Sequence, residues 1–137
     1  EAEDAADPGL NGAARALQNR ALAAGRPWLI VHADLPLLSQ GDVAQLLNRL
    51  EGTGAVIAPS HDGGTSALGA TGLVQPGYGA ASFHRHLRSL SRLSAPATVC
   101  RPGLAFDLDT VADLDMLLAA DGVSWIKGHL EAIDSLP

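Results

Sequence analysis

The chain has 137 residues, 47% of them hydrophobic and 18% charged, which is typical of a folded globular domain rather than a disordered segment. Its formal net charge of −6 argues against non-specific nucleic-acid binding, which needs a basic face. The acidic start lacks the basic-then-apolar order of a signal peptide, and no apolar run is long enough to span a bilayer. We therefore expect a single domain over residues 1–137 of a cytoplasmic protein, with no membrane or nucleic-acid partner.

The first half of the chain alternates helix and strand signals. An Ala- and Leu-rich stretch that stops at Gly25 predicts a helix over Leu10–Ala24. The apolar run Trp28–Val31 predicts a strand buried on both faces. Ser39, with Asp42 three residues later, predicts the capped start of a second helix.

The second half continues the alternation. A strand is predicted at residues 55–58, a polar, glycine-rich loop at 59–72, a helix at 81–93, a strand near 97–100, and a helix capped by Thr110 with Asp113. Strands that alternate with helices predict an α/β fold with a mostly parallel sheet and flanking helices.

Three aspartates follow predicted strands, where ligands of α/β sheets bind. Asp34 comes after the first strand, and Asp107 and Asp109 follow the apolar run 104–106. Residues i and i+2 of an extended chain point the same way, so these two carboxylates repel each other unless water or a cation offsets the charge. Carboxylates suit Mg²⁺. The alternative is that Asp34 forms a turn before Pro36, Asp107 caps a turn and Asp109 is solvated.

Two further segments are candidates for binding an anion. Gly63 and Gly64 allow a nest of inward N–H groups, followed by the hydroxyl of Thr65, although an ordinary loop is the alternative. A helix that begins near Ser82, after Gly79, offers free N–H groups. Most of the basic and imidazole side chains at positions 84–88 are expected to lie on a solvated helix face. No nucleophile–base pair is evident, so we name no catalytic residue, and the pattern favours electrostatics and positioning, as in phosphoryl or nucleotidyl transfer.

Four ordered motifs together resemble one family. They are 32-HADLPLL-38, 58-APSHDGGTSAL-68, 78-YGAASFHRHL-87 and 102-PGLAFDLDT-110. Their order and spacing resemble the CofC/FbiD guanylyltransferases of coenzyme F(420) biosynthesis, which act on 2-phospho-L-lactate or phosphoenolpyruvate.

The resemblance implies a nucleotidyltransferase-like α/β sandwich of the molybdenum-cofactor guanylyltransferase kind. It implies transfer of GMP from GTP to a phosphorylated three-carbon acid, with release of pyrophosphate. Carried over by position, it implies that Mg²⁺ is held by Asp34, Asp107 and Asp109. It also implies that the phosphoacid is held by Thr65, Gly79 and Ser82, and that the guanine nucleotide lies near Gly9 and Asn11.

The chain departs from the family pattern in two places. The family usually has Pro-Gly where this chain has Ala80-Ala81, and a glycine tolerates positive φ better than Ala81 does. The acceptor loop is therefore expected to differ, which leaves the acid open among 2-phospho-L-lactate, phosphoenolpyruvate and 3-phospho-D-glycerate. The family also begins with a strand and a phosphate-gripping loop that precede this sequence, so we expect the C-terminal part of a longer, N-terminally incomplete domain that could self-associate into a homo-oligomer.

Two other functions stay open at this point. One is another nucleotidyltransferase of the same fold with a larger acceptor, such as molybdopterin or a sugar phosphate. The other is a catalytically inactive remnant or binding module.

Overall fold

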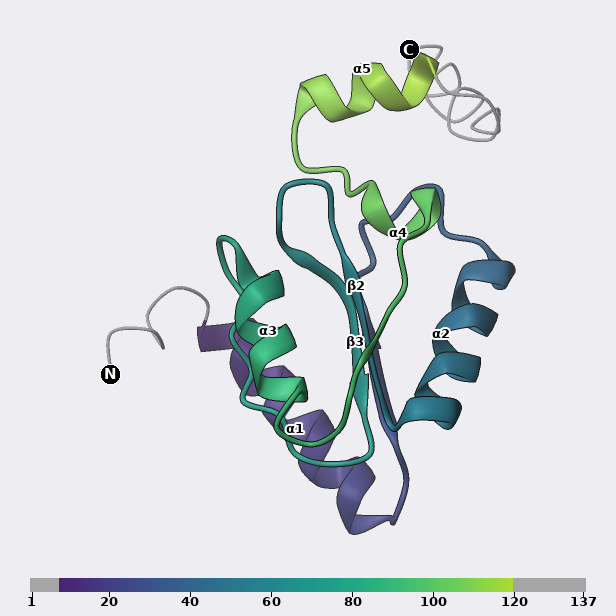
Figure 1. Ribbon diagram of the computed structural model, residues 1–137. Helices are drawn as coiled ribbons and strands as arrows, with labels where there is room; N and C mark the ends of the chain where they lie inside the picture. The colour runs from purple at the N-terminus through teal and green to yellow at the C-terminus, as the bar shows by residue number, and fades with distance from the viewer. Residues whose placement is uncertain (1–7, 120–137) are drawn as a thin grey trace, which may run out of the picture.

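The computed structural model describes residues 8–119 as a central sheet with helices on both faces (Figure 1). The elements in chain order are α1 (Pro8–Ala23), β1 (Trp28–Val31), α2 (Gln40–Thr53), β2 (Ala55–Pro59), β3 (Thr65–Ala70), α3 (Ser82–Leu90), β4 (Ala97–Thr98), α4 (Pro102–Ala105) and α5 (Val111–Ala119). The α/β class expected from the sequence is confirmed.

The sheet is mixed rather than mostly parallel. Its strand order is β1-β3-β2-β4, and β3 pairs antiparallel with both β1 and β2, whereas β2 and β4 are parallel. In the register, Leu68 of β3 lies between Ile30 of β1 and Ile57 of β2. The prediction of a continuous loop over residues 59–72 was wrong, because this segment contains β3 and the hairpin that joins it to β2.

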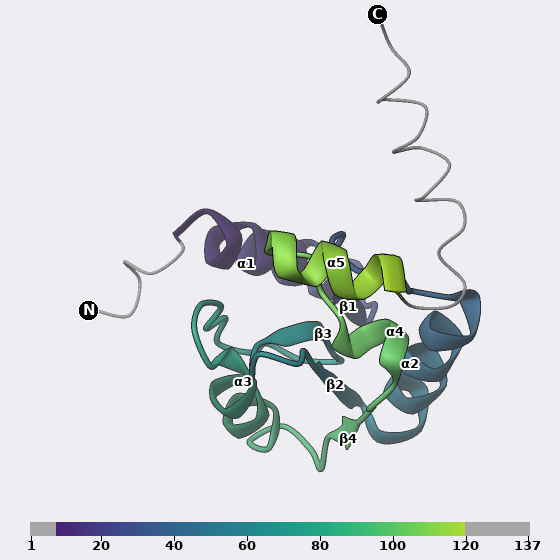
Figure 2. The same ribbon diagram turned by 90° about the horizontal axis from the view of Figure 1, so that it is seen from above.

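Helices cover the two faces of the sheet, α1 and α3 on one side and α2 and α4 on the other (Figure 2). The strand period of two divides the core accordingly. Ile57 and Leu68 pack toward α1 and α3, whereas Val56 and Ala67 pack toward α2 and α4.

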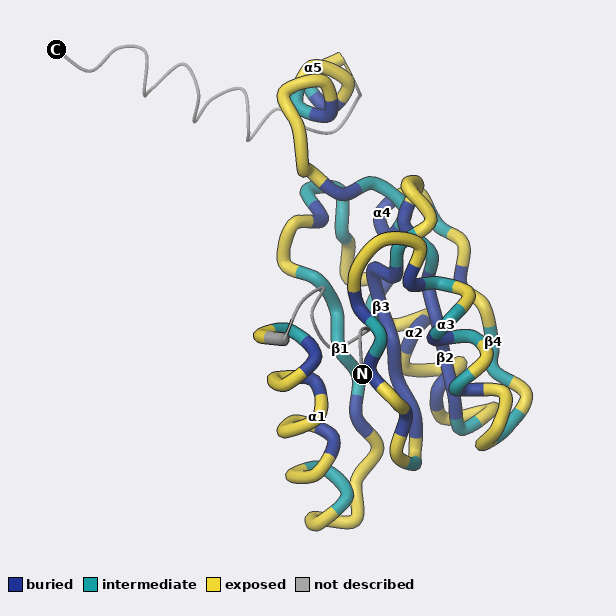
Figure 3. Tube along the Cα trace, turned by 90° about the vertical axis from the view of Figure 1, so that its left-hand side faces the viewer, coloured by how far each residue is buried: buried dark blue, intermediate teal, exposed yellow. Residues whose placement is uncertain are grey.

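The middle strands are the most buried (Figure 3), since all six residues of β3 and four of the five in β2 are buried. In β1, by contrast, only Trp28 is buried, and the other three residues are half-buried. The strand packs against the core on both faces, as predicted, but it is less buried than the prediction implied. The reason is that β1 stands at the end of the strand order, with β3 as its only described partner.

Local capping signals in the sequence are confirmed at two helices. Ser39 caps α2: its hydroxyl accepts from the backbone N–H of Asp42, and the Asp42 carboxylate accepts from the backbone N–H of Ser39. Thr110 and Asp113 make the same reciprocal pair before α5. Of the described helices, none has the length and apolar character needed to cross a membrane.

Candidate functional site

A cavity of about 180 Å³ lies at the end of the sheet where β1 and β2 finish and β3 begins. Its lining comes from five separate parts of the chain: the first turn of α1, the segment after β1, the β2–β3 hairpin, the segment before α3, and the segment after α4. The lining residues are Leu10, His32, Asp34, Ser60, Asp62, Gly64, Thr65, Tyr78, Gly79, Ser82, Asp107 and Asp109. Six of the eight site residues predicted from the sequence are among them.

Backbone hydrogen bonds hold these segments together. The N–H of Leu108 donates to the carbonyl of Asp34 at 3.0 Å, which places the 107–109 segment beside the end of β1. The N–H of His61 donates to the carbonyl of Ala105 at 2.7 Å, and that of Phe83 donates to Gly63 at 3.3 Å. The β2–β3 hairpin is therefore tied to the acidic segment on one side and to α3 on the other.

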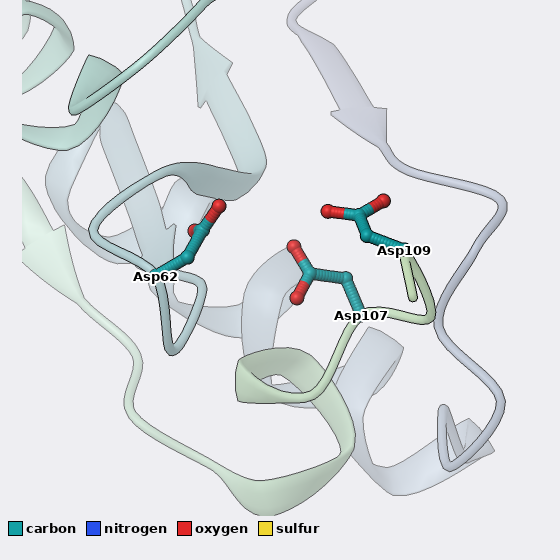
Figure 4. Close-up of side chains that lie close together, drawn as sticks. All are labelled: Asp62, Asp107 and Asp109. Carbon is teal, nitrogen blue, oxygen red and sulfur yellow. The ribbon is translucent and has the colours of Figure 1, made fainter. Parts of the chain in front are cut away.

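Three carboxylates form what we call the acidic half of the cavity: Asp62, Asp107 and Asp109. Each contributes an oxygen to a group whose members all lie within 4.8 Å of one another, and Figure 4 shows the side chains directed toward a common space. Asp34 lines the same cavity but is not in this group. Sequence reasoning treated Asp62 only as part of an anion-binding loop, although its position directly after β2 was a signal of the same kind as that of Asp34.

The carboxylates of the acidic half differ in their surroundings. Burial, together with the nearby charges of Asp62 and Asp109, raises the pKa of Asp107 above its ordinary value. Hydrogen bonds from the Ser60 hydroxyl and the Gly64 N–H lower the pKa of Asp62 and fix one of its oxygens. Hydrogen bonds therefore hold the Asp62 carboxylate in place, whereas burial and neighbouring like charges disfavour the ionised form of Asp107.

The residues of the acidic half fit a hard divalent cation. Asp107 is 7% exposed, and among the described residues no group donates a well-aligned hydrogen bond to its Oδ1. His61 Nδ1 lies 2.8 Å from that oxygen, a contact that becomes an ion pair only when the imidazole is protonated. A buried oxygen with mutually repelling neighbours is stabilised by a cation such as Mg²⁺, which prefers oxygen ligands.

Thr65 and Ser82 line the same cavity, and His86 contacts Thr65; we call these three residues the acceptor half. All three side chains are nearly or fully buried, at 3%, 2% and 0% exposed. The Ser82 hydroxyl donates to Thr65 Oγ1 at 3.0 Å, and His86 Nδ1 lies 2.8 Å from the same oxygen. Gly79 lines the cavity beside them with φ +128°, a conformation that a side chain would strain.

His86 occupies a position that the sequence did not reveal. Its side chain lies inside the acceptor half rather than on a solvated helix face, with the Tyr78 ring edge-on at a centroid distance of 4.6 Å. Burial, and then the charges of Arg85 and His32, lower the pKa of His86 to about 4. The imidazole is therefore neutral at neutral pH. The signal that could have found it is its helical spacing from Ser82 and Leu90, at i+4 and i−4.

Comparisons with known proteins identify the family of the chain. Residues 3–130 match the family described as "Guanylyl transferase CofC like". The chain belongs to this family. It is 42% identical over 125 residues to a phosphoenolpyruvate guanylyltransferase of Rubrobacter xylanophilus, which covers 85% of the chain. It is 40% identical over 114 residues to one of Sphaerobacter thermophilus, and 31% identical over 130 residues to a 2-phospho-L-lactate guanylyltransferase of Methanocaldococcus infernus, covering 80% and 92% of the chain. The chain spans 60%, 55% and 58% of the lengths of these three relatives.

The Ala80-Ala81 pair sits at the entrance to α3 of this CofC-like chain. Ala81 adopts φ +53° and is the one described residue other than glycine with positive φ. The backbone thus takes the left-handed conformation that a glycine would adopt freely, in spite of the Ala81 Cβ. The difference from the family's usual Pro-Gly therefore introduces strain next to Ser82.

Gly9 and Asn11 lie in the first turns of α1. Gly9 is exposed, whereas Asn11 is buried and its Oδ1 accepts from the N–H of Tyr78 at 2.9 Å. Asn11 therefore holds the segment that carries Gly79. Leu10, between them, reaches the cavity, so this end of α1 adjoins the site.

A larger hollow of about 470 Å³ lies beside the start of α2, and its lining is mostly apolar and contains no titratable side chain. Ser39 contributes a hydroxyl group to it, but none of its lining residues is a carboxylate like those at the end of the sheet. The chemistry of the CofC-like chain is therefore sought in the smaller cavity.

Proposed function

We propose that this chain forms the metal- and acceptor-binding part of a guanylyltransferase that transfers GMP from GTP to a phosphorylated three-carbon acid, with release of pyrophosphate. The observation that carries the proposal is that the acidic half and the residues Thr65 and Ser82 line one cavity. The names of its relatives, phosphoenolpyruvate and 2-phospho-L-lactate guanylyltransferases, supply the reaction and the acceptors.

The size of the cavity favours a small acceptor. Pockets for drug-sized ligands occupy roughly 300–1,000 Å³. The volume here is about 180 Å³, which suits a short phosphorylated acid better than a pterin or a nucleotide sugar. Thr65 and Ser82 supply hydroxyl groups, and Gly79 lets the acceptor approach the backbone.

The acidic half is proposed to hold Mg²⁺ through Asp107 and Asp109, which belong both to the set implied by the family motifs and to the group of converging oxygens. Asp62 completes the converging group, and Asp34 lies beside it. When bound, the cation would neutralise phosphate charge that otherwise keeps two anionic reactants apart. The protein's own contribution is to hold the acceptor in line for attack, with no covalent intermediate.

We further propose that the activity belongs to coenzyme F(420) biosynthesis and that the fold is of the nucleotidyltransferase type. The four sequence motifs support the pathway, and a mixed sheet with helices on both faces is compatible with the fold.

Ligand binding tests the proposal directly. The chain is titrated with phosphoenolpyruvate and with 2-phospho-L-lactate in the presence of Mn²⁺ as a spectroscopic substitute for Mg²⁺, and pyrophosphate release is assayed after addition of GTP. Asp107→Asn should lower Mn²⁺ affinity by at least about tenfold, because it removes a charged ligand. Asp115→Asn, at an exposed position on α5, is the matched control and should bind as the unsubstituted chain does.

Two outcomes would count against the proposal. If neither phosphoacid binds in the presence of Mn²⁺, the cavity is not an acceptor site. If Asp107→Asn and Asp115→Asn bind Mn²⁺ equally well, the acidic half does not hold the cation. Asp34→Asn and Asp62→Asn, compared in the same titration, identify the third ligand.

A further inference from the structure

The hydrogen bonds around His86 define its tautomer. The backbone N–H of Gly77 lies 2.9 Å from Nε2, and an N–H group can only donate. Nε2 must therefore carry a free lone pair. Because the ring is neutral at neutral pH, its single proton resides on Nδ1.

This tautomer determines what His86 does to Thr65. Nδ1 lies 2.8 Å from Thr65 Oγ1, so the imidazole donates and the hydroxyl oxygen accepts. The same oxygen also accepts from the Ser82 hydroxyl at 3.0 Å. A hydroxyl has two acceptor lone pairs and one proton. With both lone pairs engaged, the proton of Thr65 is left to point elsewhere, and Thr65 lines the cavity.

We propose that His86 is a positioning residue for the phosphoacid: by donating from Nδ1 to Thr65 Oγ1, it directs a hydroxyl proton of the Thr65–Ser82 pair into the cavity, toward an anionic oxygen of the acceptor. The inference rests on the proposed function for the identity of that ligand. If the Thr65–Ser82 bond reverses, Thr65 donates to Ser82 and the free proton passes to Ser82, which lines the same cavity. In both arrangements, His86 ensures that one hydroxyl proton is available to the anion.

The other ring nitrogen of His86, Nε2, is also fixed in position. Gly77 is held on two sides, because its N–H donates to His86 and its carbonyl accepts from Arg85 Nε and Nη2 at 3.1 and 3.0 Å. Rotation of the imidazole by half a turn would break the Gly77 contact. The segment that carries Gly79 thereby locks the orientation of the ring that in turn orients Thr65.

Two substitutions test the roles of the two imidazole nitrogens separately. Asn at position 86 can place an N–H donor where Nδ1 lies, and Gln can place an acceptor where Nε2 lies. His86→Asn should therefore keep the affinity for phosphoenolpyruvate within about threefold of the unsubstituted chain, whereas His86→Gln should weaken it about tenfold, the usual scale of one hydrogen bond to a charged group. In the Thr65→Val background, His86→Gln should cause no further loss, because the hydroxyl on which it acts is gone.

A merely structural role predicts a different pattern. In that case both variants would lower the melting temperature, and their affinities would fall together in proportion to the loss of folded protein. Equal effects of His86→Asn and His86→Gln on affinity, or additive effects of His86→Gln and Thr65→Val, would overturn the proposal.

The tautomer is measured without any ligand. Long-range ¹H–¹⁵N spectra of the chain labelled at histidine nitrogens should show His86 protonated on Nδ1 at pH 7, with its shift altered in Thr65→Val. Protonation on Nε2 would overturn the inference even if phosphoenolpyruvate binds. Conversely, failure of the unsubstituted chain to bind phosphoenolpyruvate would refute the proposed function and the ligand assigned here. The spectrum would still decide whether His86 orients Thr65. If His86→Gln does not fold, the spectra of the unsubstituted chain and of Thr65→Val keep the test decisive.

Discussion

The acidic half and the acceptor half both contribute residues to one cavity, yet they differ in exposure and in charge. Asp62 and Asp109 are exposed and Asp107 is buried beside them, so three like charges converge on one space. In the acceptor half, Thr65, Ser82 and His86 are buried, uncharged at neutral pH and hydrogen-bonded to one another. Without a cation, the acidic half thus holds three mutually repelling carboxylates, whereas the acceptor half is already organised by its hydrogen bonds.

We expect the largest effect from acidification, because the acceptor half buries His86 in its neutral form. The pKa of His86 is about 4 in the folded chain against an ordinary 6.5, so between these values the unfolded chain binds a proton that the folded chain does not. The free energy of unfolding should therefore fall as the pH drops from 6.5 to 4, by up to about 3 kcal/mol. Burial also raises the pKa of Asp107, which gives an opposite slope as that carboxyl protonates.

Urea denaturation at a series of pH values between 4 and 7 measures the effect. His86→Gln removes the titrating group and should flatten the curve in this range. An equally steep curve for His86→Gln would assign the acid sensitivity to other groups.

Substitution of Gly64 should disturb the junction between the two halves. A Cβ there would lie 2.7 Å from Ser60 Oγ and 2.9 Å from Asp62 Oδ1. Gly64→Ala should therefore displace the hydrogen bonds that hold Asp62, lowering the free energy of unfolding by about 2 kcal/mol and weakening Mn²⁺ binding.

Gly12→Ala makes the same chemical change in α1, where nothing lies within 4 Å of the added Cβ, and should leave Mn²⁺ binding unchanged. Thermal unfolding and Mn²⁺ titration give both readouts. If Gly64→Ala loses stability but keeps its Mn²⁺ affinity, Asp62 is not held in place for the cation.

Neutralising one acid should stabilise the metal-free chain. Asp107→Asn removes the charge that Asp62 and Asp109 oppose, and we expect the free energy of unfolding to rise by about 1 kcal/mol in the presence of a chelator. With Mn²⁺ at a concentration that saturates only the unsubstituted chain, the order should reverse, because that chain gains more binding energy. Denaturation curves with and without Mn²⁺ test both signs, and a loss of stability under chelator would contradict the strain assigned to the acidic half.

Sequence signals predicted the helices and the aspartates at the strand ends better than the rest. The capping pairs Ser39–Asp42 and Thr110–Asp113 were legible because both partners lie within one helical turn. The rule that ligands bind beyond strand ends predicted that Asp34, Asp107 and Asp109 would share one region, and all three line the cavity.

The errors lie where burial, rather than local pattern, decides the structure. Strand β3 has the sequence TSALGA, whose small and polar residues are typical of a loop, but it is buried between two strands. Because β3 was not predicted, the sheet was expected to be mostly parallel, whereas it is mixed. His86 was missed for a similar reason: its sequence neighbours are basic and polar, and its place opposite Thr65 depends on how α3 packs against β3.

Relief of the backbone strain at Ala81 should have the smallest effect on stability, and it tests whether the acceptor half is organised before the ligand binds. Replacement of Ala81 by Gly relieves the left-handed φ of +53° but adds backbone entropy to the unfolded chain, so the net gain in free energy of unfolding should be about 0.5 kcal/mol. Ala80→Gly, at an exposed neighbour without positive φ, carries only the entropic term and should be slightly destabilising. If the acceptor half is organised before the ligand arrives, Ala81→Gly should stabilise the chain without changing its affinity for phosphoenolpyruvate. If the affinity changes along with the stability, the backbone strain at Ala81 is relieved when the ligand binds. The acceptor half would then be strained in the absence of its ligand, as the acidic half is.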